Sequence, residues 1–340
     1  MSTRYEIDPL SDERRRLRSC WCGGDGTLRT RMSAAEIEDA FRSAAGTLWV
    51  DIDSRSDDCW RLLESAFHFH PLAIEDTRVP DGRVKIEEYP DYLFIVARGV
   101  RIAEETPEPY DIETSNRYFF LGQHYLVSVH EGASTSARAV ADRIVAHPEL
   151  IRKGADNVLY MFLDQIVDRY FPVLDALEEF IDEIEDTLMN RLDREPLQRI
   201  IALKRTLIAL RRHLAPQREL LLSLSTRPFR LLSAERQIYL RDVHDHAVRQ
   251  VESIEVYRDL LSGIMETHLT LASNRINEVM KALSVVATIV LPPTLVASIY
   301  GMNFDWLPLA GSPAGFWLAL GMMAAISGAF LLYLKRREWL

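Results

Sequence analysis

Small and polar side chains recur along one face of the uncharged stretch 282–304, near the C-terminus. The members of this polar stripe are spaced by three or four residues and begin just before the stretch: Asn277, Met280, Ser284, Ala287, Leu291, Thr294 and Ser298. Close packing of helices favours small residues and is one explanation. The other is a pore lined by repeated copies of one helix, which Met280, Leu283 and Leu291 would partly close as apolar rings.

The uncharged stretch ends in the sequence Tyr300-Gly301-Met302-Asn303-Phe304. Gly301 lets the chain turn or approach another backbone closely, so Asn303 would lie at the mouth of the stretch. Pro292 and Pro293 remove helix hydrogen bonds to carbonyls four residues earlier. Residues 282–334 contain no His and no Cys, so the soft ligands that bind Zn²⁺ directly are missing there.

Two stretches of the chain are long and apolar enough to cross a bilayer, which takes about 20 residues. They are 282–304 and 307–334, separated by Asp305 and followed by Lys335, Arg336 and Arg337. Basic residues lie outside both stretches, so the positive-inside rule predicts cytoplasmic termini and an outward connection. The first 30 residues lack the apolar segment of a signal peptide. The sequence therefore predicts an inner (plasma) membrane protein with a large cytoplasmic body.

The body begins with a region that alternates between strand and helix patterns. Apolar, β-branched or aromatic runs predict strands at 47–52 and 92–100, and a hairpin at 117–129 around Gly122-Gln123. Helical patterns fall near 34–43 and 57–67. We therefore expect an α/β domain over residues 1–155.

Beyond Gly154 the pattern becomes helical, with helices expected at about 156–190 and 196–223. Between Pro228 and Pro292 there is no proline and one glycine, and apolar residues recur over several heptads. A helix of about 60 residues is roughly 90 Å long, which no compact domain holds. We expect a stalk that continues into the first span and associates with identical copies of itself.

The composition excludes several functional classes. The net charge of −10 argues against nucleic-acid binding. The chain lacks a G-x-x-x-x-G-K-[ST] phosphate loop, so ATP-driven pumping is not expected. Three cysteines cannot form a disulfide framework. Passive movement of a cation down the membrane potential therefore fits the sequence better than nucleic-acid binding or ATP-driven pumping.

Several separate motifs resemble those of the CorA family of magnesium and cobalt transporters, over at least residues 66–340. They are His70-Pro71-Leu72 with Glu75-Asp76, Tyr239 to Val243, Asn277 to Lys281, Tyr300 to Phe304, and the basic end Lys335 to Leu340. The resemblance implies an α+β membrane protein that forms a funnel-shaped homopentamer. It implies acidic "willow" helices at 156–227, a stalk at 228–281, a first span at 282–300, an external loop at 301–313, a second span at 314–334 and a cytoplasmic tail at 335–340.

The resemblance also implies roles for individual residues. Gly301, Met302 and Asn303 would form the selectivity filter, with the polar stripe and Leu283 lining and closing the pore. Mg²⁺ gives up its waters reluctantly, and a ring of Asn303 amides could hydrogen-bond that water shell. Glu75, Asp76 and Asp242 would bind regulatory Mg²⁺ between cytoplasmic domains. Co²⁺ and Ni²⁺ are implied as further substrates.

Other functions remain open on the sequence. The external loop reads Leu307-Pro308-Leu309-Ala310 where the family often has MPEL, so Asp305 alone would attract cations there. A zinc transporter of the ZntB type is the nearest rival, although such proteins usually depart from Gly-Met-Asn. A tethered metalloenzyme would use His68 and His70, or His244 and His246. A membrane-anchored coiled-coil scaffold would explain the stalk but not Asn303.

Overall fold

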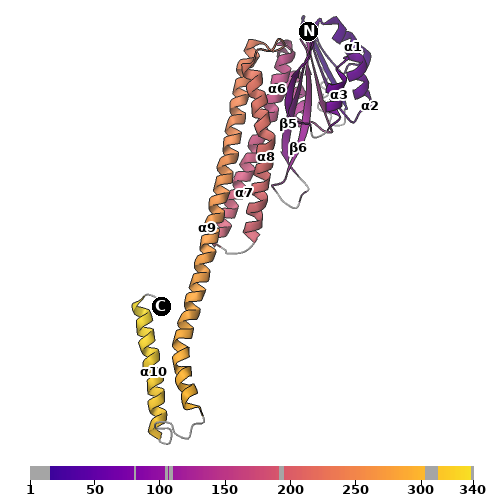
Figure 1. Ribbon diagram of the computed structural model, residues 1–340. Coiled ribbons are helices and arrows are strands. Elements are labelled where there is room, and N and C mark those ends of the chain that lie inside the picture. The colour runs from indigo at the N-terminus through magenta and orange to yellow at the C-terminus, as the bar shows by residue number, and fades with distance from the viewer. Residues whose placement is uncertain are drawn as a thin grey trace. The chain divides into compact units, whose positions relative to one another are not determined.

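The computed structural model describes residues 16–79, 82–103, 106, 110–190, 195–302 and 313–337, shown in Figure 1. It divides into two compact units, residues 1–262 and 263–340, and helix α9 (Ala234–Tyr300) belongs to both. Asn303 and Asp305 lie outside the described residues, as do most of the loop 301–313 and the last three residues.

Among the described residues, seven strands of the first unit form a single sheet in the order β2-β1-β3-β7-β6-β5-β4. Only β3 and β7 pair in parallel, and every other neighbouring pair is antiparallel. The strands are β1 (Leu17–Gly23), β2 (Leu28–Thr30), β3 (Gly46–Asp53), β4 (Lys85–Glu88), β5 (Leu93–Ile102), β6 (Ile112–Leu121) and β7 (Tyr125–His130).

Both faces of the sheet are buried under helices (Figure 1). Because side chains alternate along a strand, Leu93 and Ile95 of β5 join one core while Phe94 and Val96 join the other. One face is covered by α1 (Ala34–Ser43), α2 (Asp57–Arg61), the π-helical turn η1 (Leu62–Ala66) and α3 (Pro71–Thr77), and the other by α4 (Thr135–Ala146), α5 (Glu149–Arg152) and α6 (Ala155–Asp168). The predicted α/β domain is confirmed.

The strands predicted at 47–52 and 92–100 are β3 and β5, and the predicted hairpin is β6 and β7 joined through Gly122-Gln123. Strands β1, β2 and β4 were not predicted. β1 places Arg18 and Ser19 in the protein interior, where they are paired with polar partners, so its sequence lacks a clean apolar pattern.

The single helix expected at about 156–190 is two helices, α6 and α7 (Tyr170–Asn190), separated at Arg169. Pro172 explains the break, because its nitrogen cannot donate to the Asp168 carbonyl and its ring crowds that carbonyl. α6 contributes Phe162 and Leu163 to the core of the sheet.

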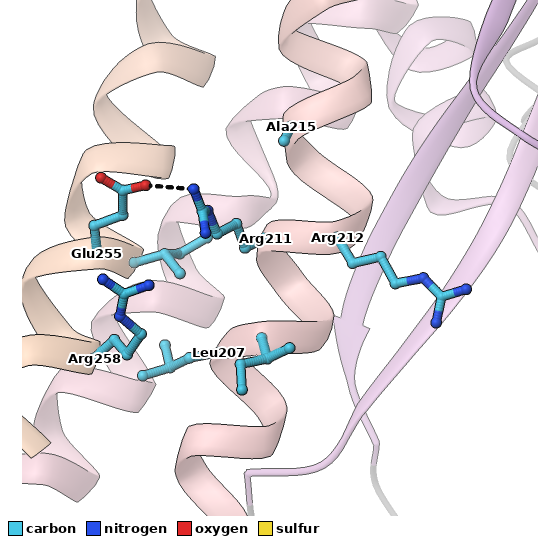
Figure 2. A pocket seen from close by; sticks show the side chains of 8 residues that line it. Leu207, Arg211, Arg212, Ala215, Glu255 and Arg258 are labelled. Atoms are coloured by element: carbon cyan, nitrogen blue, oxygen red, sulfur yellow. Dashed lines mark ion pairs between the residues drawn. The ribbon is translucent and has the colours of Figure 1, made fainter. Parts of the chain in front are cut away.

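Helix α8 (Glu195–Thr226) returns antiparallel to α7 and packs beside the first part of α9 (Figure 1). A groove of about 350 Å³ lies between α8 and α9, with an apolar floor that includes Leu207 and Ile254. Figure 2 shows an ion pair between Arg211 and Glu255 across it, with N and O atoms 2.9 Å apart.

Helix α9 is 67 residues long, or about 100 Å at 1.5 Å per residue. It starts at Ala234 rather than directly after Pro228, because the Ser233 hydroxyl accepts a hydrogen bond from the Arg236 nitrogen and caps the first turn. It continues without interruption through Gly263, Pro292 and Pro293. The predicted continuity of stalk and first span is confirmed.

The second unit contains the end of α9 and helix α10 (Pro313–Arg336). Each carries a window long and apolar enough for a membrane span, with mean hydropathy of 2.0 and 1.9. Only 11% of either window is buried, whereas the core helix of a soluble protein would be mostly buried. The two apolar helices therefore have the exposure expected of segments in contact with lipid or with other chains.

Candidate cation pathway and regulatory carboxylates

The polar stripe lies on a face of α9 that α10 does not cover. Every member of the stripe is exposed in the single chain, and the exposed fraction of Leu291 reaches 66%. Val285, in contrast, is 7% exposed and lies on the side of α9 that borders α10. Ile289 lies on that same side, and Thr288 lies at its edge, where it lines a groove with α10.

Helix geometry places these two faces nearly opposite each other. At about 100° per residue, the stripe is centred roughly 150° away from Val285 and Ile289, and Thr288 lies between the two faces, roughly 70° from the centre of the stripe. α10 therefore packs against the back of α9 and leaves the stripe free for contact with water or with copies of itself. This arrangement is what a pore helix with an outer supporting helix requires.

One of the two prolines of α9, Pro293, leaves a carbonyl without its helix hydrogen bond, and α10 supplies a donor to that carbonyl. Pro293 cannot donate to the Ile289 carbonyl, and the Ser327 hydroxyl of α10 donates to that carbonyl instead, at 3.4 Å. In an apolar environment an unpaired carbonyl costs several kcal/mol, so this replacement donor stabilises α9. It also fixes which side of α9 faces α10.

Hydroxyl groups on α9 are held by their own helix. The Thr294 hydroxyl donates to the Val290 carbonyl at 2.8 Å, and the Thr288 hydroxyl donates to the Ser284 carbonyl at 2.7 Å. A hydroxyl that donates inward leaves its oxygen lone pairs pointing outward as acceptors. Thr294 can therefore accept hydrogen bonds from water, including water around a cation.

α9 ends where the expected selectivity filter begins. The Gly301 nitrogen donates to the Ala297 carbonyl at 2.9 Å, and the Met302 nitrogen donates to the Ile299 carbonyl at 3.3 Å. Gly301 and Met302 thus form a turn directly after Tyr300, the last residue of α9, and Met302 precedes Asn303 in the chain. Asn303 and Asp305 were predicted to select and attract the cation, and both lie outside the described residues.

The carboxylates expected to regulate the pore start with Glu75 and Asp76 at the C-terminal end of α3. Glu75 is exposed, whereas Asp76 is half-buried and accepts a hydrogen bond from the Lys85 ammonium at 2.6 Å. Lys85 also donates to Glu87 at 2.7 Å. Burial lowers the pKa of Lys85, but its bonds to Asp76 and Glu87 outweigh that effect and raise the pKa. Lys85 was not predicted, because it lies on a different element, β4.

Asp242 lies on α9, and its side chain is 72% exposed. Nearby are Asp164 and Asp168 of α6, and His246 one turn along α9. The His246 ring nitrogens lie 3.2 Å from Asp168 and 3.8 Å from Asp242. Burial, followed by the Asp168 charge, raises the pKa of Asp164 to about 6. Three carboxylates, those of Asp164, Asp168 and Asp242, therefore lie close together, with Arg143 4.0 Å from Asp164.

Asp76 and Asp242 are not joined within one chain by any hydrogen bond or ion pair among the described residues. In the same part of the chain, no three His, Cys, Asp or Glu side chains are grouped to hold a metal ion. Regulatory binding through Asp76 and Asp242 would therefore need carboxylates from two copies.

Three of the four histidines that would serve a tethered metalloenzyme lie in contact with other groups of the chain. The His70 Nδ1 atom accepts a hydrogen bond from the Leu72 nitrogen and caps α3. His246 is bonded to Asp168, and His244 lies 3.3 Å from Asp245. Cys20 and Cys22 are buried in the core, and burial raises the pKa of Cys20 to about 12.

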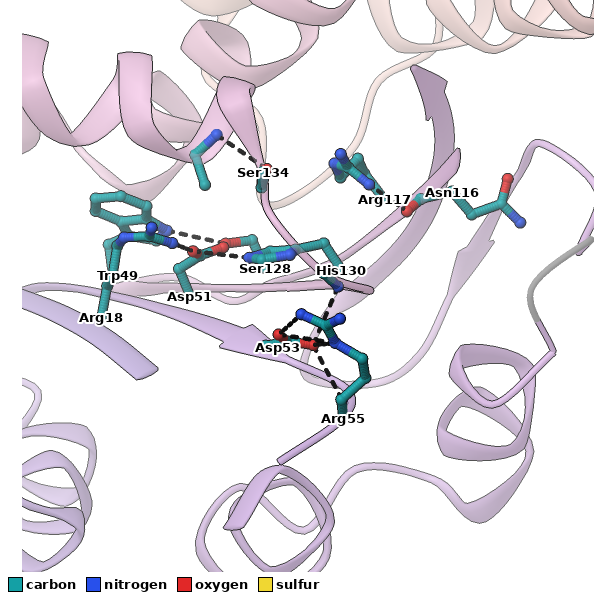
Figure 3. Close-up of polar contacts among 12 residues, drawn as sticks. Arg18, Trp49, Asp51, Asp53, Arg55, Asn116, Arg117, Ser128, His130 and Ser134 are labelled. Carbon is teal, nitrogen blue, oxygen red and sulfur yellow. Dashed lines mark hydrogen bonds and ion pairs between the residues drawn. The ribbon is translucent and has the colours of Figure 1, made fainter. Parts of the chain in front are cut away.

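A buried polar cluster that was not predicted joins β1, β3 and β7, as Figure 3 shows. Asp51 accepts hydrogen bonds from Arg18 at 2.9 Å, Ser128 at 2.6 Å and His130 at 3.1 Å. Burial raises the pKa of Asp51, but His130, Ser128 and Arg18 together hold it below its usual range. The sequence signal was present, since Asp51 interrupts the apolar run of β3, but one chain does not reveal its partners.

Comparison with known proteins agrees with this architecture. The family model described as CorA-like Mg²⁺ transporter protein matches residues 44–336. The cobalt/magnesium transport protein CorA of Thermotoga maritima is 34% identical over 88% of this chain and 85% of its own length.

Solved structures share the fold. The complete structure of the CorA magnesium transporter from Methanocaldococcus jannaschii superposes with a TM-score of 0.82 at 23% identity, over 95% of this chain and 98% of that one. The ZntB cytoplasmic domain from Vibrio parahaemolyticus gives 0.60 at 16% identity, over 76% of this chain and 98% of that domain. With most of its length matched by the family model, the chain belongs to the family of CorA-like Mg²⁺ transporter proteins.

Proposed function

We propose that this protein is a divalent cation channel that moves hydrated Mg²⁺ into the cytoplasm down its electrochemical gradient. The observation that carries the proposal is the polar stripe, which lies uncovered on the side of α9 away from α10. Five copies of α9 arranged around an axis would turn the stripe into a pore. Asn277, Thr294 and Ser298 would be its polar rings, and Met280, Leu283, Ala287 and Leu291 its narrow apolar section.

The chemistry of the pore favours an ion that keeps its water. Residues 282–334 offer no His or Cys ligand, so Zn²⁺ would have no preferred direct ligand there. Asn303, together with Gly301 and Met302, would hydrogen-bond the water shell of Mg²⁺, and Asp305 would concentrate cations at the mouth. Co²⁺ and Ni²⁺ would pass by the same route. The termini would be cytoplasmic, in a bacterial-type inner membrane.

Internal Mg²⁺ would close the pore by binding between neighbouring cytoplasmic domains. Asp242 lies near the carboxylates of Asp164 and Asp168, and a divalent ion would replace the single lysine that holds Asp76. Without Mg²⁺ the like charges of Glu75, Asp76 and Asp242 would repel across the interface between copies. Mg²⁺ bound there would favour the closed arrangement.

The test is ion flux into liposomes that contain the purified full-length protein and an ion-reporting dye. We expect Mg²⁺ entry under an inside-negative potential. The Asn303→Ala variant should reduce it about tenfold, the effect of losing about 1.4 kcal/mol of hydrogen bonding to the ion. Ser312→Ala, which removes a polar group from the same loop, is the matched control and should keep the flux.

Other outcomes decide between the alternatives. Zn²⁺ entry driven by a pH gradient, with little Mg²⁺ flux, would move the protein to the ZntB type. An intact oligomer that conducts neither ion would favour the scaffold and overturn the transport proposal.

A further inference from the structure

A groove between α9 and α10 has no role in the cation pathway. Its volume is about 360 Å³, and it is lined by Thr288 of α9 and by Phe330, Tyr333, Leu334 and Arg337 at the end of α10. Thr288 is not a member of the polar stripe and lies roughly 70° around α9 from its centre, toward α10, so the groove opens beside the proposed pore face and not on it. Leu334 is 7% exposed and forms part of the floor, while Tyr333 is largely exposed.

The groove joins an apolar wall to a positive charge. Phe330, Tyr333 and Leu334 supply the wall, and the Arg337 guanidinium lies 5.9 Å from the centre of the Tyr333 ring. α10 has 24 residues and is about 36 Å long, slightly more than the hydrocarbon core of a bilayer. Given that α10 crosses a membrane, as the proposed function requires, Arg337 lies at the depth of the lipid headgroups.

We propose that this groove binds an anionic phospholipid, with its acyl chain against Phe330 and Leu334 and its phosphate on Arg337. A guanidinium matches the geometry of a phosphate and can donate two hydrogen bonds to it. Lys335 and Arg336 precede Arg337 in the sequence and add to the positive charge at this end of α10, and Glu338 follows Arg337. An anionic phospholipid has an apolar acyl chain for the apolar wall of the groove and a phosphate for Arg337 at its other end.

A second copy of the protein is a poorer occupant. The expected spans 282–300 and 314–334 contain no Asp or Glu, so another copy would offer Arg337 a carboxylate only from residues that flank them in the sequence, such as Glu278 and Glu338. A divalent cation would be repelled by the same guanidinium. An anionic lipid supplies both the charge and the apolar surface that the spans themselves lack.

The test is native mass spectrometry of the intact oligomer in neutral detergent, titrated with phosphatidylglycerol or phosphatidylcholine. We expect the wild type to bind phosphatidylglycerol more tightly than phosphatidylcholine. Arg337→Gln should weaken that binding about fivefold, the effect of one basic residue near a lipid surface. Arg336→Gln is the matched control, because it removes the same charge from a residue that does not line the groove.

A second variant tests the groove independently of charge. Thr288→Trp fills the groove and keeps Arg337, and it should also lose bound phosphatidylglycerol while the number of subunits in the oligomer stays unchanged. Equal losses in Arg336→Gln and Arg337→Gln, or unchanged binding in Thr288→Trp, would overturn the proposal. Displacement of phosphatidylglycerol by inorganic phosphate would also overturn it, in favour of a free-anion site. Lipid binding is measured without ion flux, so its failure is distinct from a failure of the transport proposal.

Discussion

Asp51 shows how one buried carboxylate links three strands that are distant in the sequence. It is 1% exposed and is bonded to Arg18 of β1 and to Ser128 and His130 of β7. Burying a charge is costly unless its partners satisfy it, and here three partners do. The cluster therefore stabilises the order β1-β3-β7 as long as Asp51 is ionised.

The Asp51→Asn variant should lose about 3 kcal/mol of unfolding free energy at pH 7, because Arg18 is left with a weaker partner. The folded pKa of Asp51 is lowered, so its contribution is complete above the unfolded pKa of about 3.9 and is lost as the pH falls through the folded value. The wild type should thus lose stability more steeply than the variant below about pH 4.

Urea unfolding at several pH values, followed by tryptophan fluorescence, measures this difference. Trp49 reports locally, because its indole nitrogen donates to Ser128 at 3.1 Å. Asp245→Asn, at an exposed carboxylate, is the control and should change the stability little. Parallel pH profiles for wild type and Asp51→Asn would contradict the prediction.

Among the helices and strands, those whose own apolar pattern causes their burial were predictable from the sequence. Those that form only by pairing with a distant segment were not. The apolar periodicity of α9 and the apolar runs of β3 and β5 arise from burial of their own side chains, so the sequence predicted them. β1 and the Asp51 cluster depend on pairing with β3 and β7, which no local pattern reveals. The break at Arg169 was predictable from Pro172 and was missed.

The polar stripe was also predictable, because its spacing alone places it on one face. Which face α10 covers was not predictable, since that depends on the bond between Ser327 and Ile289. The ion pair of Asp76 with Lys85 likewise depends on how β4 lies beside α3.

Cysteine substitution on α9 should separate the two faces. The native thiols are buried, so a polar thiol reagent should react only with introduced cysteines. We expect Ala287→Cys to react in liposomes and to lose most of its Mg²⁺ flux, because it lies on the polar stripe. Val285→Cys, on the face beside α10, should react slowly and keep its flux. Equal reactivity at both positions would contradict the assignment of faces.

The Ser327→Ala variant should lower the stability of the detergent-solubilised protein by about 1 kcal/mol, because the Ile289 carbonyl loses its donor. Pro293→Ala restores a backbone donor for that carbonyl, so Ser327→Ala should cost much less in that background. Thermal unfolding of the four proteins in a double-mutant cycle gives the coupling. Purely additive effects would show that Ser327 does not replace the missing bond.

At the scale of the whole molecule, the proposed regulation needs carboxylates on one copy to meet those on the next. Within a single chain Asp76 is paired with Lys85, and Asp242 lies near His246. In the proposed regulation, Lys85 would compete with Mg²⁺ for Asp76. The concentration of internal Mg²⁺ that closes the pore should depend on this lysine as much as on the carboxylates.

The Lys85→Gln variant should therefore close at a lower internal Mg²⁺ concentration, by about fivefold, since one charge at 4 Å is worth about 1 kcal/mol in water. Asp76→Asn should shift closure in the opposite direction, because it removes the ligand. Flux into liposomes preloaded with graded Mg²⁺ measures both shifts, and Lys153→Gln, at an exposed lysine on another element, is the control. If Lys85→Gln and Asp76→Asn shift closure in the same direction, their pair acts only to hold α3 against β4, and Mg²⁺ does not bind at Asp76.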